Sequence, residues 1–327
     1  MRAPAFWNRP KSWQSVLLAP LGLLYAKATA SRIANATPEK IGIPVISVGN
    51  INVGGTGKTP TVIAIVERLR NLYHQPHIIS RGYGGSIEGP ILVDPSIHTA
   101  DQVGDEPLLL SAFAEVWVSK NRTAGAIAAK NAGATVVVLD DGHQNPSLHK
   151  DLSIVVVDAV YGFGNRCCLP SGPLREPVQV GLERADLLLS IGSNDAQITF
   201  SSQNEPVDTP HLKAVLEPLK TGMDWTDTTA FAFAGIGHPE KFFKTLRDLG
   251  VNLVHAEPLD DHQKLSSNLL TRFQNDARAK GAQLITTEKD AVRLPTAFRS
   301  QVITLPVRLA FEDDEALLSV LKKSASV

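Results

Sequence analysis

Two short groups of polar residues in this 327-residue chain could bind and transfer phosphate. Lys58 and Thr59 end a glycine-rich stretch, and Asp140 and Asp141 end a run of apolar residues. Where no Cβ intervenes, consecutive backbone N–H groups can curl around phosphate oxygens. A lysine and a hydroxyl beside such a loop suit a polyphosphate and its metal ion, and carboxylates are ligands that Mg²⁺ prefers. The two groups together predict a site for a nucleotide triphosphate and Mg²⁺.

The glycine-rich stretch is expected to form a phosphate-binding P-loop between a strand and a helix. Residues 45–48 are apolar and mostly β-branched, as in a buried strand, and Pro60 suits the first turn of a helix. The loop between them consists of Asn52, Val53, Gly54, Gly55, Thr56 and Gly57. The pattern G-x-x-x-x-G-K-[ST] has Asn52 in place of its first glycine. Because asparagine tolerates positive φ, we expect the loop to close.

The second group follows a strand that reads as buried on both faces. Residues 136–139 are Val-Val-Val-Leu and lead directly into Asp140 and Asp141, a Walker-B pattern. In P-loop enzymes the carboxylate at the end of such a strand binds Mg²⁺ beside the hydroxyl of the loop, here that of Thr59. Lys58 is expected to reach the β- and γ-phosphates. We therefore expect Thr59, Asp140 and Asp141 to be the metal site.

Three further polar positions are ambiguous from the residues alone. Gly104 precedes Asp105 and Glu106 at a probable helix start, where carboxylates favour the first turn. Capping is therefore the stronger interpretation, and a general base or metal ligand is the alternative. Arg122 leads a helix after a short strand. His262 follows two aspartates in a loop, and a lone histidine there is usually only solvated.

Composition excludes several classes of protein. The net charge of −1 gives no general basic field for nucleic acid. The two cysteines, Cys167 and Cys168, are adjacent, so they rarely bridge, and no zinc-binding spacing is present. A reducing cytosolic compartment fits this composition.

The N-terminal apolar run, residues 16–26, has basic residues on both sides and leaves several interpretations open. It is short for a transmembrane helix and contains Pro20. A signal peptide would fit the small residues 28–30, but a P-loop needs cytosolic nucleotide. A helix lying on a membrane surface, with Trp13 and Tyr25 at the interface, is the third interpretation. A helix packed on the protein's own core is almost as well supported.

Alternating strand and helix patterns predict an α/β fold with parallel strands in two domains. Residues 192–210 are polar and suggest a boundary, and a new strand–helix unit begins near residue 229. We expect an N-terminal membrane-surface helix at 1–35 and a P-loop kinase domain at 36–205. A linker or ribbon at 206–225 and a smaller α/β domain at 226–327 complete the expected division.

Seven motifs in order resemble those of the tetraacyldisaccharide 4′-kinase family, and the resemblance covers about residues 10 to 310. They are GNINVGGTGKTP (49–60), SRGYGG (80–85), VGDEP (103–107), LDDGHQ (139–144), LPSGPLREP (169–177), DDH (260–262) and TTEKDAVRL (286–294). His143 stands where the family more often shows phenylalanine. The resemblance implies two α/β/α sandwich domains, the first P-loop NTPase-like, joined by a short β-ribbon. The active site is then expected in the cleft between them.

The resemblance also implies roles for individual residues. Asp105 would help to activate a sugar hydroxyl and His262 would tune it, as a carboxylate–imidazole pair can. Asp140 and Asp141 would serve Mg²⁺ and nucleotide, and Arg122 would offset phosphate charge. Glu106 and Gln144 match motif positions near the reacting phosphates and would contact the nucleotide.

The expected function is an ATP- and Mg²⁺-dependent kinase that phosphorylates the 4′-hydroxyl of a tetraacylated glucosamine disaccharide 1-phosphate in lipid A biosynthesis. We expect a monomer on the cytoplasmic face of the bacterial inner membrane, peripheral or monotopic, with an acylated disaccharide lipid as substrate and no nucleic acid partner. One alternative is a soluble P-loop NTPase, such as a GTPase-type switch or metal chaperone. Thr287 and Glu288 stand where guanine recognition needs Asn and Lys, which counts against it. A nucleotide-gated membrane-binding module without transfer chemistry is the other alternative.

Overall fold

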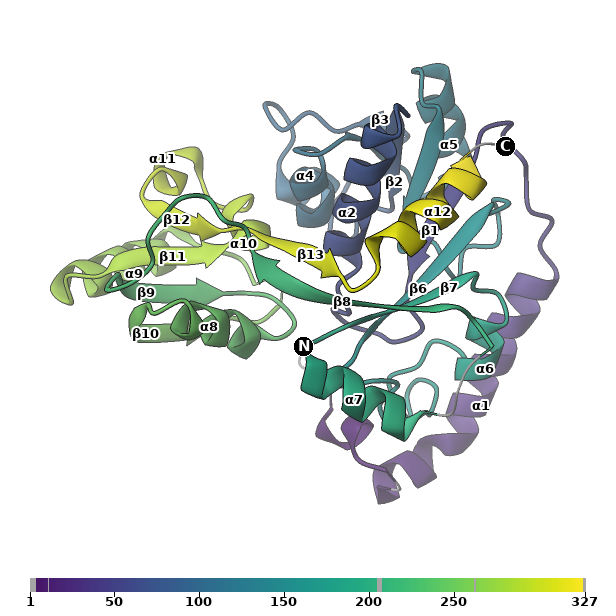
Figure 1. Ribbon diagram of the computed structural model, residues 1–327, viewed down its shortest axis with the longest axis horizontal. Helices are drawn as coiled ribbons and strands as arrows, with labels where there is room; N and C mark the ends of the chain where they lie inside the picture. The colour runs from purple at the N-terminus through teal and green to yellow at the C-terminus, as the bar shows by residue number, and fades with distance from the viewer. Residues whose placement is uncertain (1–3, 11, 205–207, 262, 326–327) are drawn as a thin grey trace.

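The computed structural model describes residues 4–10, 12–204, 208–261 and 263–325. Two β-sheets dominate it, one with nine strands and one with four (Figure 1). The nine-stranded sheet has the order β13-β8-β7-β6-β1-β5-β2-β4-β3. Its pairs are parallel except β3 with β4 and β13 with β8. The expectation of an α/β fold with parallel strands is confirmed.

Most neighbouring strands of the large sheet are not consecutive in the chain, so crossover connections join them. Their bounds are β1 Val45–Gly49, β2 Pro76–Ser80, β3 Ile91–Leu92, β4 Glu115–Val118, β5 Val136–Asp140, β6 Leu152–Asp158, β7 Leu187–Ile191, β8 His211–Pro218 and β13 Val307–Phe311. The helices connected to this sheet are η1 Ala5–Asn8, α1 Trp13–Ala34, α2 Lys58–Asn71, α3 Ala100–Val103, α4 Asp105–Leu110, α5 Arg122–Asn131, α6 Val178–Leu182, α7 Asn194–Gln203 and α12 Asp314–Ala325.

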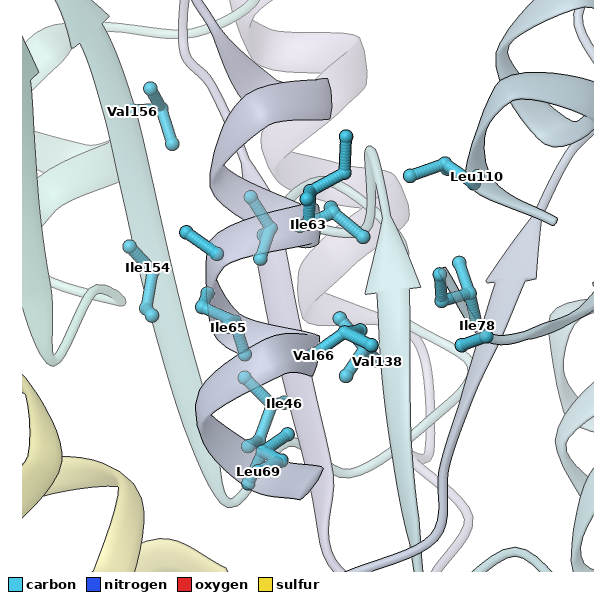
Figure 2. Close-up of a cluster of buried hydrophobic side chains, with 14 of the residues drawn as sticks. Ile46, Ile63, Ile65, Val66, Leu69, Ile78, Leu110, Val138, Ile154 and Val156 are labelled. Atoms are coloured by element: carbon cyan, nitrogen blue, oxygen red, sulfur yellow. The ribbon is translucent and has the colours of Figure 1, made fainter. Parts of the chain in front are cut away.

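The core of the large sheet forms where α2 packs across the central strands (Figure 2). All five residues of β1 and all five of β5 are buried, as continuous apolar runs require in a sheet covered on both faces. The apolar face of α2, including Ile65 and Leu69, packs in one cluster with Ile46 and Val138. This packing fixes the start of α2, and hence Lys58, against the carboxyl ends of β1 and β5.

The small sheet has the order β10-β9-β11-β12 and all its strands are parallel. Its strands are β9 Thr229–Ala234, β10 Asn252–Pro258, β11 Gln283–Thr287 and β12 Val302–Leu305, and its helices are α8 Pro239–Asp248, α9 Ser267–Ala279, α10 Glu288–Ala291 and α11 Thr296–Arg299. Phe243 of α8 and Phe273 of α9 lie in separate apolar clusters. Because each cluster includes residues of β9, the sheet is covered on both faces.

The chain crosses between the sheets along β8 and β13, which pair as an antiparallel ribbon (Figure 1). The two sheets divide the chain differently from the expected small domain at 226–327. Residues 307–325 return to the large sheet, where Leu317 and Leu321 of α12 join its core. Residues 194–203 of the expected polar boundary form α7, because Phe200 is buried against the large sheet's second cluster. We propose a larger unit at 36–218 with 307–325 and a smaller one at 225–305.

Helix α1 lies along the outside of the large unit (Figure 1). Its large apolar side chains are mostly exposed. Its buried residues are the small Ser15, Gly22 and Thr29. The Ser171 hydroxyl donates to the Ser15 carbonyl oxygen at 2.7 Å, and a Cβ at Gly22 would lie 2.9 Å from the Cys168 carbonyl oxygen. Within the described residues α1 is also the one helix long and apolar enough to cross a membrane. The helix therefore packs on the protein through small residues and turns large apolar ones outward.

The core packing of α2 gives a first prediction. Ile65→Ala should lower the free energy of unfolding by about 2–5 kcal/mol, because Ile65 is fully buried and the truncation leaves a cavity. Urea unfolding followed by circular dichroism measures the change. Ile198→Ala, at a side chain that is 70% exposed on α7, is the control and should cost about 0.5 kcal/mol or less. Equal losses in both variants would contradict the packing described here.

Candidate active site

The glycine loop after β1 forms an open cradle at the start of α2. Gly54 and Gly57 have φ of 113° and 97°, in the region that favours glycine. A Cβ built on Gly54 or Gly55 would meet nothing within 4 Å, so their backbone faces open space. The Asn50 amide Nδ2 donates to the Thr56 hydroxyl at 3.1 Å and to the Gly54 carbonyl oxygen at 3.3 Å. Asn50 thus fixes the shape of the loop through hydrogen bonds to two of its residues, a role that the sequence did not reveal.

The structure corrects the conformation expected for Asn52. Its φ is not positive, since the left-handed conformations in this loop fall on Gly54 and Gly57. Instead, its side-chain Nδ2 donates to the Gly162 carbonyl oxygen at 3.0 Å. Asn52 therefore ties the loop to the segment after β6, which a glycine could not do. Thr56 and Val53 complete the loop between these fixed points.

Asp140 ends β5 directly beside Val48 of β1, in register with it. One of its oxygens, Oδ2, accepts from the Ser80 hydroxyl at 3.0 Å. The other, Oδ1, is buried and has no hydrogen-bond partner among the described residues. Burial, with the nearby negative charges of Glu106 and Asp141, raises the Asp140 pKa to about 7. A buried carboxylate with an unused oxygen is costly unless a cation or proton meets it.

Asp141 is in a different environment from Asp140, although the two are adjacent. The Arg175 guanidinium Nη1 contacts both of its oxygens at 2.9 and 3.0 Å, and Lys58 Nζ lies 3.6 Å from Oδ1. Burial alone would raise the Asp141 pKa, but Lys58 and Arg175 outweigh it and the pKa is lowered. Asp141 is thus paired with two cations, whereas Asp140 makes no ion pair within the described part of the chain. Arg175, in the GPLREP stretch, is a site residue whose partner the sequence did not indicate.

The donor set fits Mg²⁺ better than a metal held by protein alone. No group of three or more His, Cys, Asp or Glu side chains that could hold a metal occurs in the part of the chain that the structure describes. Mg²⁺ usually takes one or two protein ligands and keeps water and phosphate oxygens for the rest. The unused Asp140 oxygen and the Thr59 hydroxyl at the start of α2 match that pattern.

Arg122 and Gln144 support this cluster from inside the protein. Arg122 is buried at the start of α5, and its Nη2 donates to the Asp140 carbonyl oxygen at 2.9 Å. Burial lowers its pKa, while Asp140 and Asp141 oppose that shift. Gln144 Nε2 donates to the Asn50 carbonyl oxygen at 2.7 Å, and its Oε1 accepts from Arg175 at 3.2 Å. Arg122 therefore holds the backbone of Asp140, and Gln144 connects the start of the glycine loop to Arg175.

Asp105 and Glu106 begin α4, after Gly104 with a φ of 91°. Asp105 is only 4% exposed, and its Oδ1 accepts from the Glu106 backbone N–H at 2.9 Å. Glu106 is close enough to Asp140 to raise the pKa of that carboxyl. Asp105 is therefore a buried first-turn residue rather than an exposed cap. His262 lies outside the described residues, so the expected Asp105–His262 pair has no geometry here.

Residues of the small unit lie against the loop from the other side. A Cβ on Gly237, after β9, would lie 3.6 Å from the Gly55 nitrogen. The rings of Tyr161 and His238 stack with centroids 4.3 Å apart, and Lys241 pairs with Asp158 beside them. The glycine loop, the aspartates and the carboxylates of α4 therefore gather where the two sheets meet.

Three comparisons with known proteins agree with this geometry. A family model described as tetraacyldisaccharide-1-P 4′-kinase, LpxK, matches residues 14–326. A tetraacyldisaccharide 4′-kinase of Dinoroseobacter shibae is 59% identical over 326 residues, which cover 98% of this chain and 97% of the relative. One from a Jannaschia species is 54% identical and covers 99% of both chains. The fold is also similar to a crystal structure of LpxK from Aquifex aeolicus in complex with ATP, with a TM-score of 0.77, 26% identity and coverage of 95% and 99%.

The raised pKa of Asp140 gives a second prediction. The folded protein keeps this proton up to about pH 7, whereas the unfolded chain loses it near 3.8, the ordinary pKa of an aspartate. Its stabilising contribution is therefore full below pH 3.8 and is lost as the pH rises through about 7. Asp140→Asn stays neutral, so without metal and nucleotide its melting temperature should fall less over this range than that of the wild type. Differential scanning calorimetry with a chelator present measures both curves.

The exposed Asp195 of α7 provides the matched control. Asp195→Asn should give a curve parallel to that of the wild type. If the melting temperature of Asp140→Asn also changes with pH in parallel to that of the wild type, Asp140 does not carry a raised pKa in the folded protein.

Proposed function

The chain belongs to the tetraacyldisaccharide-1-P 4′-kinase family and is an ATP-dependent lipid A 4′-kinase, and from this premise we propose how its residues carry out the transfer. The reaction phosphorylates the 4′-hydroxyl of a tetraacylated glucosamine disaccharide 1-phosphate. Neither a soluble NTPase switch nor a metal chaperone is favoured by this family membership. The observation that supports the proposal is the meeting of the glycine loop, Asp140 and the Asp105–Glu106 pair at one edge of the large sheet.

The glycine loop would hold the phosphates of ATP. Its open backbone at Gly54 and Gly55, followed by the N-terminus of the 14-residue α2, favours bound anions. Lys58 Nζ lies 3.6 Å from Asp141 Oδ1, at the start of α2, and would reach the β- and γ-phosphates when ATP binds. Before ATP binds, Asp141, held by Arg175, would keep the Lys58 side chain ordered at the start of the helix. In this proposal Asp141 is therefore not a metal ligand.

We assign Mg²⁺ to Thr59 and Asp140 on the ground of the unused buried Asp140 oxygen. When bound, Mg²⁺ offsets negative charge on the phosphate oxygens. Arg122 holds the Asp140 backbone in place and adds positive charge behind it. This arrangement gives the two aspartates different roles, with Asp140 for the metal and Asp141 for Lys58.

Asp105 would act as the general base. It would accept the proton of the sugar 4′-hydroxyl while the 4′-oxygen bonds to the γ-phosphorus and the bond from that phosphorus to the β–γ bridging oxygen breaks. The electrons of the broken bond remain on ADP, so one proton and one phosphoryl group are accounted for. Burial keeps competing water away from the base. His262 would tune Asp105, as the family resemblance implies.

Helix α1 would bring this site to its lipid substrate. Trp13, Leu17 and Leu24 are each more than 60% exposed on its outer side, which suits contact with lipid. Because the acceptor carries four acyl chains and ATP is cytosolic, we propose that the protein works as a monomer on the cytoplasmic face of the inner membrane. Hydrogen bonds of Ser15 with Asn165 and Ser171 would keep α1 packed on the protein while its outer side contacts lipid.

The base assignment gives a third prediction, measured with purified protein, ATP and the disaccharide 1-phosphate in detergent micelles. Asp105→Ala should lose about 10²–10⁴-fold in turnover, because no group accepts the hydroxyl proton. Its ATP affinity should stay unchanged, since the glycine loop is intact. Asp101→Ala, at an exposed carboxylate four residues earlier, is the control and should keep wild-type turnover. Collapse of nucleotide binding in Asp105→Ala would show that the base assignment is wrong.

The role of α1 gives a fourth prediction. Leu17→Asp combined with Leu24→Asp should release the protein from the membrane fraction, because charged groups resist burial among acyl chains. ATP binding should remain. Ile97→Asp is the control, since Ile97 is similarly exposed at 69% in a loop of the large unit and should leave membrane association unchanged. Full membrane association of the double variant would refute the anchoring role.

A further inference from the structure

The stretch TTEKDAVRL has no part in the function described so far. Its first residues end β11, residues 288–291 form α10, and Arg293 follows in the next turn. Lys289 and Arg293 are four residues apart, so their side chains can lie on the same side of this turn. Both reach out of the small unit toward the carboxylates at the start of α4.

Lys289 joins two carboxylates from different parts of the chain. Its Nζ lies 3.4 Å from Glu106 Oε1 and 3.3 Å from Asp261 Oδ1. Its side chain is 17% exposed. Burial alone would lower the Lys289 pKa, but Glu106 and Asp261 outweigh it and the pKa is raised. Lys289 therefore stays charged and holds the large and small units together at this point.

Arg293 makes the second connection. Its Nη1 donates to the Gln263 carbonyl oxygen at 3.1 Å, and its Nη2 pairs with Asp290. Its Nε is buried, makes no hydrogen bond within the described part of the chain, and lies 4.0 Å from Asp105 Oδ2. A buried donor without an acceptor is costly. If Arg293 Nε and Asp105 Oδ2 moved closer by less than about 1 Å, Nε would gain an acceptor and the Asp105 carboxylate would be fixed in place.

The surrounding residues hold Arg293 in this direction. Asp290 is fully buried and accepts from the Gly235 backbone N–H at 3.0 Å and from the Thr287 hydroxyl at 2.7 Å. A Cβ at position 235 would lie 2.8 Å from Arg293 Nη2, so the glycine leaves room for the guanidinium. These contacts fix the direction of the Arg293 guanidinium. An ion pair on the surface would not need a buried carboxylate such as Asp290 to hold it.

We propose that Lys289 and Arg293 are positioning residues that fix the Asp105–Glu106 carboxylate pair, together with Asp261 and Gln263, in the geometry used for phosphoryl transfer. Asp261 and Gln263, which they contact, stand on either side of His262 in the sequence. The inference rests on the proposed role of Asp105. It assigns the TTEKDAVRL stretch a part in the reaction without placing it in contact with substrate.

The test measures kcat and the KM for ATP in Lys289→Met and Arg293→Gln. Each should lose about 10²-fold in kcat, the size expected when a reacting group is misplaced by about 1 Å. The KM for ATP should stay near wild type because the glycine loop is untouched, even where loss of the cation beside the buried Asp290 lowers the melting temperature of Arg293→Gln. Lys289→Arg keeps the charge and should recover most of the lost kcat. Lys264→Met is the matched control, since Lys264 pairs with Asp101 3.7 Å away in solvent.

A second comparison separates positioning from general damage. In an Asp105→Ala background, Arg293→Gln should lower kcat no further, because residues acting through one group are not additive. A further full loss there, or a joint fall of kcat, ATP affinity and melting temperature without recovery in Lys289→Arg, would overturn the inference. Wild-type kcat in both single variants would overturn it as well. Full activity of Asp105→Ala would instead mean that the base assignment itself has failed.

Discussion

The buried Asp140 carboxyl, whose Oδ1 has no hydrogen-bond partner among the described residues, is the constraint on which the rest of the site depends. A carboxylate that keeps one oxygen unused in the interior costs free energy that the surrounding packing must offset. The neighbouring groups are arranged so that they do not remove this cost. Arg122 bonds to its backbone rather than to its carboxylate, and Arg175 and Lys58 pair with Asp141 instead. This arrangement supports the proposal that a cation arriving with the nucleotide binds at Asp140.

Charge balance also explains why the site lies between two sheets. The large sheet alone brings Asp105, Glu106 and Asp140 together, and Glu106 already disturbs the Asp140 pKa. Lys289, 3.4 Å from Glu106, and Arg293, 4.0 Å from Asp105, come from the small unit. Carboxylates of the large unit thus face cations of the small unit, so this part of the site is assembled where the two units are in contact. This is a physical reason for a two-unit kinase in place of a single P-loop domain.

Local patterns were enough to predict the parts of the molecule that depend on near neighbours in sequence. The apolar runs of β1 and β5, with the glycine loop and Lys58-Thr59 after β1, were all predicted in the right order. Features set by distant contacts were not. The different environments of Asp140 and Asp141 depend on Arg175, more than thirty residues later, which pairs with Asp141. The conformation of Asn52 depends on Gly162, and α7 forms at a polar stretch because of tertiary burial.

As a lipid A 4′-kinase, the protein passes the γ-phosphoryl group of ATP to a lipid hydroxyl rather than to water. The direct measurement uses ATP labelled at the γ-phosphate with the disaccharide 1-phosphate in micelles, and compares label in the lipid with label in free phosphate. We predict that label enters the lipid in equal amounts with the ADP formed, and that ADP formation nearly stops without the lipid. Release of the label as free phosphate at the same rate with and without the lipid would contradict the account.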